Sequence, residues 1–310
     1  MKRALIFGAS GFVGPYLARE MLDHGYEVSG ADFHETNAFS YTHFYSVDLT
    51  DKESVKKAIE DCNPTHIFNL AAISSVGQSW KDPELTMRVN TCGAINIMDA
   101  AYHLSERPRV LLVGSSEEYL PSDMPLSEDM PINANNPYGV SKVAQERLGA
   151  IYRKQYGLLV YCVRAFNHIG VGQRPSFVIP SWCKQVAEIE KSEKPGIICV
   201  GNLNVSRDFS DVRDIVRAYR MVIESNYSDE IFNIGSGKAV SLRSILSTIL
   251  SFSSQSIQVE TDSSLLRPVD NAFICCDNSK IKRLIGWEPT KDLTATLKDI
   301  YSSFLIKEKE

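Results

Sequence analysis

Short apolar runs alternate with longer amphipathic segments through the first half of the chain. Because the runs are continuously apolar, they predict strands that are buried on both faces of a sheet. The predicted strands are Arg3–Phe7, Glu27–Ala31, His43–Val47, His66–Leu70, Arg109–Val113 and Leu158–Arg164. The predicted helices are Phe12–His24, Lys52–Asp61 with Asp51 as its N-cap, Glu84–Leu104 and Pro137–Tyr156. This alternation predicts an α/β fold with a doubly wound parallel sheet of the Rossmann type.

The regular alternation stops after Phe166. Asn167–Pro175 reads as a loop, and a helix is expected over Ser181–Lys191. Ile231–Ile234, followed by a glycine turn, resembles another core strand, so we expect the chain to return once to the first sheet. The predicted dinucleotide-binding domain is therefore residues 1–166 with a returning segment at about 207–237. Residues 167–206 and 238–310 are expected to form a smaller C-terminal α/β substrate domain.

Composition narrows the class of protein. The 310 residues are 44% hydrophobic and 23% charged, which is ordinary for a globular chain. A net charge of −5 gives no reason to expect a nucleic-acid partner. No apolar stretch has the length of a membrane span, and the N-terminus lacks the pattern of a signal peptide. The seven cysteines show neither CxxC nor zinc-ligand spacing, so we expect reduced thiols, no metal and a cytoplasmic protein.

A glycine-spaced turn lies between the first predicted strand and the first predicted helix. Such a turn lets a pyrophosphate approach the backbone and meet the free amides at the helix N-terminus. A purely structural crossover turn is the alternative. The residues expected to hold a dinucleotide here are Gly8, Gly11, Phe12, Val13 and Gly14.

Asp32 ends the second strand, 18 residues beyond Gly14. An acidic residue at this offset accepts hydrogen bonds from the adenosine ribose and repels a 2′-phosphate. NAD(H) is therefore favoured and NADP(H) remains allowed, because His34 nearby could weaken the repulsion. An exposed turn aspartate is the alternative. Strand-end geometry adds further cofactor candidates, namely Asp48, Leu49, Leu70, Ala71 and Ala72.

Tyr138 and Lys142 form an i,i+4 pair after the helix-start sequence Asn136-Pro137. A free tyrosine has a pKa near 10, and an ammonium group, a helix N-terminus and oxidised nicotinamide would each lower it. Tyr138 could then exchange a proton with a substrate oxygen while hydride is transferred. Ser116 is the favoured second donor, with Ser115 as the alternative, because this serine pair follows a strand at the carboxyl edge of the sheet.

The chain as a whole resembles the extended short-chain dehydrogenase/reductase family. The segments that carry the resemblance include GASGFVG, SSEEY, YGVSK, FNHIGVGQ, VSRDFSDVRDIVRAY and IFNIGSGK. Within that family the chain looks most like the GDP-4-keto-6-deoxy-D-mannose reductases. The resemblance implies reduction of the 4-keto group of a GDP-linked 6-deoxyhexose to give GDP-D-rhamnose.

The resemblance also implies roles for individual residues. Ser116, Tyr138 and Lys142 would be the catalytic set. The residues that would contact the nucleotide sugar are Ser74, Ser75, Glu117, Asn167, Val178, Lys184, Arg207 and Arg267. Arginine suits the diphosphate because its forked donors match phosphate oxygens. A structural ion pair of Arg207 with Asp211 or Asp214, and a solvated Lys184, are the alternatives.

Three other functions remain open. A sugar-nucleotide 4,6-dehydratase needs an additional carboxylate beside the serine, which Glu117 or Glu118 could supply. A 4-epimerase would hold NAD without consuming it. A dinucleotide sensor without turnover would keep only the fold. Family resemblance further implies a homodimer through a four-helix bundle built from the helices at 84–104 and 137–156.

Overall fold

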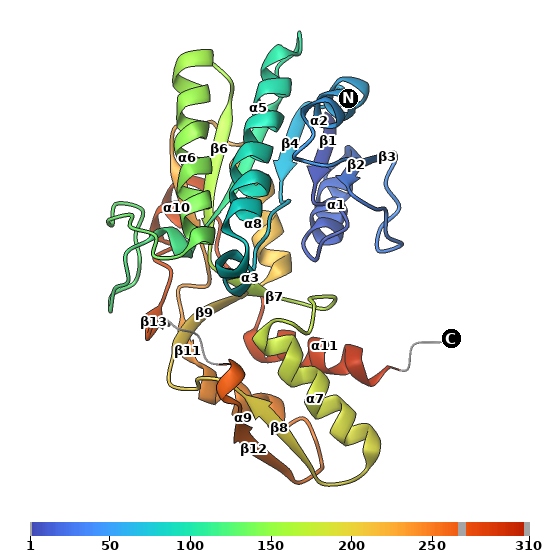
Figure 1. The fold of residues 1–310 in the computed structure, drawn as a ribbon, viewed down its shortest axis with the longest axis vertical. Coiled ribbons are helices and arrows are strands. Elements are labelled where there is room, and N and C mark those ends of the chain that lie inside the picture. Colours follow the sequence, from blue (N-terminus) through green and yellow to red (C-terminus); the bar gives the residue numbers. More distant parts are fainter. Residues whose placement is uncertain (1, 266–270, 307–310) are drawn as a thin grey trace.

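The computed structural model describes residues 2–265 and 271–306, and within them one large parallel sheet dominates the fold (Figure 1). Its seven strands run in the order β10-β6-β5-β4-β1-β2-β3. The bounds are β1 Lys2–Phe7, β2 Tyr26–Asp32, β3 Phe44–Ser46, β4 His66–Asn69, β5 Arg109–Ser115, β6 Val160–Ala165 and β10 Ile231–Ile234. The order reverses between β1 and β4, which is the switch point of a doubly wound fold, so the predicted fold class is confirmed.

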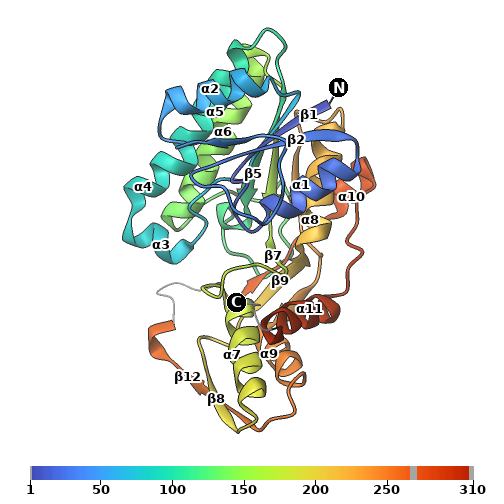
Figure 2. The same ribbon diagram turned by 90° about the vertical axis from the view of Figure 1, so that its right-hand side faces the viewer.

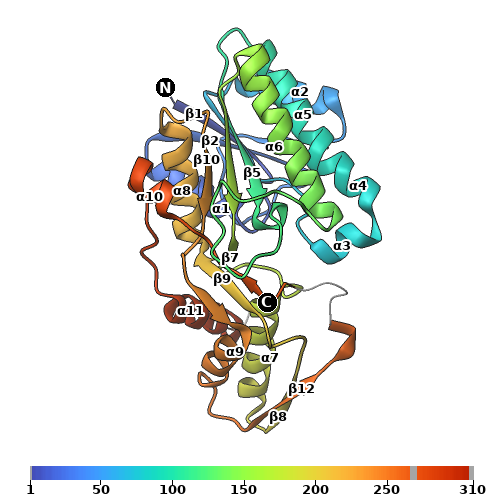
Figure 3. The same ribbon diagram turned by 90° about the vertical axis from the view of Figure 1, so that its left-hand side faces the viewer.

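Helices cover both faces of this sheet. Figures 2 and 3 show α1 (Gly14–Asp23) and α8 (Val212–Glu224) on one side of the sheet. On the other side lie α2 (Lys52–Cys62), α5 (Gly93–His103) and α6 (Pro137–Tyr156). Asp51 caps α2, as predicted, by accepting from the amide of Glu53. Each helix buries an amphipathic stripe against the strands.

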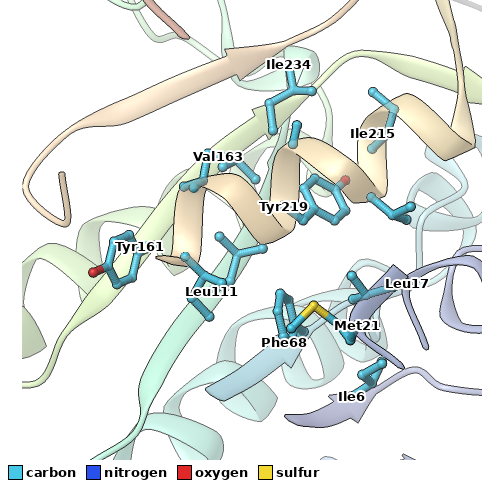
Figure 4. Close-up of a cluster of buried hydrophobic side chains, with 14 of the residues drawn as sticks. Ile6, Leu17, Met21, Phe68, Leu111, Tyr161, Val163, Ile215, Tyr219 and Ile234 are labelled. Atoms are coloured by element: carbon cyan, nitrogen blue, oxygen red, sulfur yellow. The ribbon is translucent and has the colours of Figure 1, made fainter. Parts of the chain in front are cut away.

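Alternate residues of each strand supply the two hydrophobic cores. Leu111 and Val163 point toward α1 and α8, where they pack with Met21 and Tyr219 (Figure 4). Leu112, the next residue of β5, belongs to the core under α2 and α5. Burial on both faces explains why the strands read as continuous apolar runs in the sequence.

The helix expected at 84–104 is interrupted. It consists of α4 (Pro83–Met87), a π-helical turn over Arg88–Cys92 and then α5. A shorter helix, α3 (Val76–Lys81), precedes it. Asp82, which separates α3 from α4, caps α4 by accepting from the amide of Leu85. The wider π turn gives Asn90 a different direction from the one a regular α-helix would impose.

A second, smaller unit lies at the carboxyl edge of the large sheet (Figure 3). It holds a sheet in which β9 (Ser206–Asp211) pairs with β7 (Asn167–Ile169), β11 (Ala239–Ser241) and β13 (Phe273–Ile274). It also holds the strand pair β8 (Gly196–Val200) and β12 (Ile257–Thr261). Its helices α7 (Val178–Ser192), α9 (Leu242–Leu250) and α11 (Leu293–Leu305) enclose a separate hydrophobic core.

Three segments differ from the division expected from the sequence. Asn167–Ile169 is a strand rather than a loop, and it pairs with β9. Strand β9 belongs to the smaller sheet, so the segment that returns to the large sheet begins at α8. Helix α10 (Ser279–Ile285) contacts β10, and Trp287 is buried in the core of the first unit. The domain bounds thus interleave more than the sequence indicated.

No helix within the described ranges combines the length and the apolar character needed to cross a membrane.

Candidate active site

The glycine turn after β1 is tightly packed. Gly8 has a φ of +82°, and its carbonyl oxygen accepts from the Gly11 amide at 3.1 Å. A Cβ built on Gly8 would lie 2.7 Å from the Ala71 nitrogen, and one on Gly14 would lie 2.2 Å from the Ala9 oxygen. Glycine is therefore required at both positions, because any side chain would push the turn away from β4 and α1.

The N-terminus of α1 faces outward from this turn without a side-chain cap. Val13 occupies the N-cap position and makes no side-chain hydrogen bond there. The first amides of the helix can therefore donate to an anionic group, and the helix dipole favours negative charge. Phe12 closes one side of the turn, stacking with His168 at a ring distance of 6.2 Å. These features fit the pyrophosphate of a dinucleotide.

Asp32 lies at the end of β2 beside the same turn. Its Oδ2 accepts from the Ser10 amide at 3.0 Å, and its Oδ1 accepts from the Phe33 amide at 2.8 Å. The carboxylate thus ties the glycine turn to the second strand. Its negative charge stands where the sequence predicted the ribose contact.

The other expected cofactor residues follow β3 and β4. Asp48 Oδ1 accepts from both the amide and the hydroxyl of Thr50, at 2.8 Å each, so this oxygen shapes the turn before α2. The Leu49 carbonyl accepts from Asn96 of α5 at 2.8 Å. The Leu70 amide donates to Phe7, which keeps the residues after β4 against the glycine turn. Ala71 and Ala72 continue this segment and are half-buried.

Strand β5 ends at Ser115, and a single 3-10 turn over Ser116–Glu118 follows. Ser115 Oγ accepts from the Glu117 amide at 3.1 Å. Glu117 Oε2 in turn accepts from the side-chain amide of Asn136 at 2.8 Å, which connects this turn to the start of α6. Asn136 also caps α6, because its Oδ1 accepts from the Gly139 amide at 2.9 Å. The cap predicted from the sequence is confirmed.

Tyr138, Lys142 and Ser115 lie together at the start of α6. The Ser115 side chain hydrogen-bonds to the phenol of Tyr138. Lys142 Nζ lies 5.8 Å from the centre of the Tyr138 ring and donates to the Val113 carbonyl at 2.8 Å. The main chain of Ser116 accepts from the Tyr119 amide. Ser116 stays a prediction as the catalytic serine, while the contact with Tyr138 favours Ser115, the alternative.

The ionisation of this pair differs from expectation. Burial raises the pKa of Tyr138 above its ordinary value, and the hydrogen bond from Ser115 only partly opposes this. Burial also lowers the pKa of Lys142 to about 8, with the charge of Glu118 acting in the opposite direction. The predicted lowering of the tyrosine pKa is therefore wrong for the polypeptide by itself, since desolvation outweighs the effect of the neighbouring cation.

Asn90, from the π turn, joins two segments of the site. Its Oδ1 accepts from the Ile73 amide at 2.8 Å, and its Nδ2 donates to Ser141 Oγ at 2.9 Å. Nδ2 also donates to the Ile73 carbonyl at 3.2 Å. Asn90 therefore holds the segment after β4 against the catalytic helix, and it is fully buried in doing so.

The expected substrate residues come from several elements. Ser74 and Ser75 are exposed after β4, and Ser75 caps α3. Asn167 is exposed on β7, and Val178 is exposed at the start of α7. Lys184 is an exposed residue of α7 that pairs with Glu188 at 3.7 Å.

The two arginines expected at the diphosphate have different standings. Arg207 is buried on β9 and donates to the Ser206 carbonyl at 2.9 Å. Asp211 is bound by Arg213 and Asp214 by Arg217, so these acids have arginine partners from α8. Arg267 lies outside the described residues.

Four residues of the site were missed or underrated from the sequence. Gly139, Asn136 and Asn90 shape the backbone around Tyr138, and Glu118 is buried beneath Ser115. Only Asn136 carried a sequence signal for its role, because an asparagine before a proline is typical of a helix start.

Comparison with known proteins agrees with this geometry. A sequence model of the GDP-mannose 4,6 dehydratase family matches residues 5–300. The GDP-6-deoxy-D-mannose reductase of Pseudomonas aeruginosa is 26% identical over 313 residues, covering 100% of this chain and 99% of the relative.

Solved structures are similar over nearly the whole chain. RMD from Pseudomonas aeruginosa, complexed with NADPH, has a TM-score of 0.87 at 26% identity and covers 98% of this chain and 99% of its own. UDP-glucose 4-epimerase of Thermus thermophilus, in complex with NAD, has a TM-score of 0.86 at 25% identity, covering 97% and 98%. With its glycine turn and its serine–tyrosine–lysine set, the chain belongs to the GDP-mannose 4,6-dehydratase family of extended short-chain dehydrogenases/reductases.

Proposed function

We propose that this enzyme reduces the 4-keto group of a GDP-linked 6-deoxyhexose, converting GDP-4-keto-6-deoxy-D-mannose to GDP-D-rhamnose with NAD(P)H. The hydrogen bond between Ser115 and Tyr138, with Lys142 one helical turn further on, carries the proposal. Such a set donates a proton to a carbonyl oxygen, which is the need of a reductase. Similarity to a reductase over the full length of both chains supports the same reaction.

Each member of the set has a defined role. Tyr138 donates its phenolic proton to the sugar O4 as the carbonyl becomes an alcohol, and Ser115 stabilises the charge that develops on that oxygen. The nicotinamide cofactor supplies the hydride to C4. Lys142 binds the nicotinamide ribose and returns a proton toward Tyr138. Ser116, on the same turn, remains the second candidate for the serine.

The cofactor side favours NAD(H). The Asp32 carboxylate stands at the end of β2 beside the glycine turn, and it would repel a 2′-phosphate. NADP(H) remains allowed, since a similar structure is complexed with NADPH and another with NAD. Gly8, Gly11 and Gly14 would hold the pyrophosphate with Phe12 and Val13. The residues that would flank the rest of the cofactor are Asp48, Leu49, Leu70, Ala71 and Ala72.

Substrate would enter between the large sheet and the smaller unit. Ser74, Ser75 and Glu117 are candidates for contacts with the hexose. Asn167 and Arg207, with Arg267, would face the diphosphate, and Val178 and Lys184 would line the base pocket. The two chain segments come from opposite sides of the junction between the units, which suits a long ligand that spans them.

One alternative, a 4,6-dehydratase, has an observation in its favour. Dehydration across C5–C6 requires a carboxylate beside the serine, and Glu117 is a half-buried acid on the serine turn. Glu118 is less suited to contact a sugar, because it is fully buried and its Oε1 accepts from the Ser115 amide at 2.7 Å. The matching family is also the one described as GDP-mannose 4,6 dehydratase.

One assay separates the candidates. Purified protein is incubated with GDP-4-keto-6-deoxymannose and NADH or NADPH, and the sugar product is identified by NMR. Reductase activity would oxidise one cofactor per sugar and yield rhamnose, whereas 6-deoxytalose would show attack from the other face. Turnover of GDP-mannose without added reduced cofactor would establish the dehydratase instead, and turnover of UDP-galactose the epimerase.

Tyr138→Phe tests whether the protein is an enzyme or a sensor. The variant should lose turnover by about a hundredfold or more while still binding NADH. Tyr152→Phe is a matched control, because Tyr152 lies on the same helix and packs in the core away from the site. Equal behaviour of both variants would favour a non-catalytic sensor.

The quaternary structure is a further part of the proposal. We propose a homodimer in which the helical layer of α4, α5 and α6 pairs with its copy in a four-helix bundle. Val140 and Ile151 of α6 are 46% and 49% exposed, so this helix presents apolar side chains to solvent. Light scattering should give twice the chain mass, and a monomer at micromolar concentration would refute the dimer.

A further inference from the structure

Glu118 is a fully buried acid at the end of the serine turn. Its Oε1 accepts from the Ser115 amide at 2.7 Å, and its Oε2 has no hydrogen-bond partner within the described residues. Gly114 makes room for this carboxylate, since a Cβ on Gly114 would lie 2.3 Å from Oε1. A buried acid with one unbonded oxygen is costly to the fold and therefore calls for an explanation.

Glu118 shares a single guanidinium with a second acid. Arg164 forms a bidentate pair with Glu146, donating from Nε and Nη2 at 2.8 Å each, and its Nη1 donates to the Tyr119 hydroxyl at 2.7 Å. Glu118 Oε2 lies 3.8 Å from Arg164 Nε without a hydrogen bond. Burial and the charge of Glu146 raise the pKa of Glu118, and Arg164 opposes them.

This acid acts on each member of the catalytic set. It holds Ser115 through the main-chain amide, at the residue whose side chain bonds to Tyr138. Its charge raises the pKa of Tyr138 and that of Lys142. The titratable and charged groups around it are Glu146, Lys142 and Tyr138 on α6, Arg164 and Cys162 on β6, and the adjacent Glu117 and Tyr119.

We propose that Glu118 is a positioning residue for the catalytic set, fixing Ser115 at the tip of β5 and placing an ionisable group directly behind Tyr138 and Lys142. A negative charge there favours the protonated forms of both side chains, which is the state a proton donor needs before reduction. The role rests on the proposed function insofar as Ser115, Tyr138 and Lys142 are the reacting groups.

The test measures Lys142 without any sugar substrate. Protein labelled with ¹³C at lysine is titrated by NMR, and the Lys142 signal is assigned by its loss in Lys142→Met. Glu118→Gln retains an oxygen for the Ser115 amide and removes the charge, so the pKa of Lys142 should fall by about one unit. Glu118→Asp keeps the charge but withdraws the carboxylate from Ser115, so it should mainly lower kcat.

Glu128→Gln is the matched control. Glu128 is a half-buried acid of the same network whose Oε1 accepts from a main-chain amide, that of Asn233, at 2.8 Å. Its substitution should leave the Lys142 pKa unchanged. An unchanged Lys142 pKa in Glu118→Gln, or a shift of equal size in Glu128→Gln, would overturn the proposal.

Kinetics then separate this role from the reaction itself. If the reductase activity is present, Glu118→Gln should move the pH profile of kcat to lower pH and leave KM for the cofactor unchanged. If the protein does not reduce the proposed sugar, turnover is absent in every variant while the Lys142 titration still responds to Glu118. A failure of the proposed function is thus distinguished from a failure of the positioning role.

Discussion

Gly139 lies directly against the main chain of Glu117. A Cβ at Gly139 would stand 2.3 Å from the Glu117 carbonyl oxygen and 2.9 Å from the Ala134 side chain. The start of α6 can approach the serine turn this closely only because residue 139 has no side chain. The separation between Tyr138 and Ser115 is therefore set by a backbone-to-backbone contact.

Gly139→Ala should push α6 away from the serine turn. A displacement of about 1 Å at reacting groups can cost a hundredfold in rate, so we expect kcat to fall by about that factor. KM for the cofactor should change little, since the glycine turn is elsewhere. Gly77→Ala is the control, because a Cβ there meets only Ser75 Oγ at 3.8 Å. Equal activity of the two variants would contradict the argument.

Lys142→Met should stabilise the protein while abolishing turnover. Burial lowers the pKa of Lys142 to about 8 from its ordinary 10.5, so the folded state holds this charge at a cost. That difference corresponds to about 3 kcal/mol at pH 7, an upper bound because methionine also loses the hydrogen bond to Val113. Urea unfolding of both proteins at pH 7 measures it.

The same pKa sets the pH dependence. Between pH 8 and pH 10.5 the unfolded chain binds more protons at Lys142 than the folded chain does, so wild-type stability rises with pH in this window. The advantage of Lys142→Met should be full below pH 8 and shrink steadily above it. An advantage that stays constant from pH 7 to about pH 10 would show that Lys142 is not desolvated.

Asn90→Ala should loosen the segment after β4. The substitution leaves the Ile73 amide and Ser141 Oγ without their buried partner, which costs about 2 kcal/mol. We expect a lower thermal midpoint and a higher KM for the cofactor. Asn96→Ala, which removes one hydrogen bond to the Leu49 carbonyl on the neighbouring helix, provides the comparison. An Asn96 variant with the larger KM would reverse the assignment.

Asp32→Asn should change the choice of cofactor. It removes the charge expected to repel a 2′-phosphate and keeps an oxygen for one of the two amides that Asp32 binds. The ratio of kcat/KM for NADPH to that for NADH should rise about tenfold. Steady-state kinetics with both cofactors decide it, and an unchanged ratio would remove Asp32 from the specificity argument.

Much of the fold follows from local patterns. Helix α6 begins and ends where predicted, because Asn136 caps one end and Gly157, with a φ of +66°, ends the other. The helix expected at 84–104 was less accurate, since the cap at Asp82 and the π turn at Asn90 depend on contacts with distant segments. Strand β7 was missed because its three residues are ordered by pairing with β9.

The site was predictable in its chemistry but not in its geometry. Spacing identified Tyr138 and Lys142, and position at a strand end identified the serine pair. Which serine meets Tyr138 depends on the 3-10 turn over Ser116–Glu118, whose direction has no sequence signature. The different fates of Glu117 and Glu118, one half-buried and one fully buried, depend on the same turn.

Strand β10 has a consequence for the synthesis of this protein. It pairs with β6, although about 65 residues separate the two strands, and Trp287 joins the same core from still further along the chain. A ribosome must therefore release most of the polypeptide before the first unit can close. Until then the edge of β6 is open to other strands, so slow translation or truncation before residue 231 should favour aggregation.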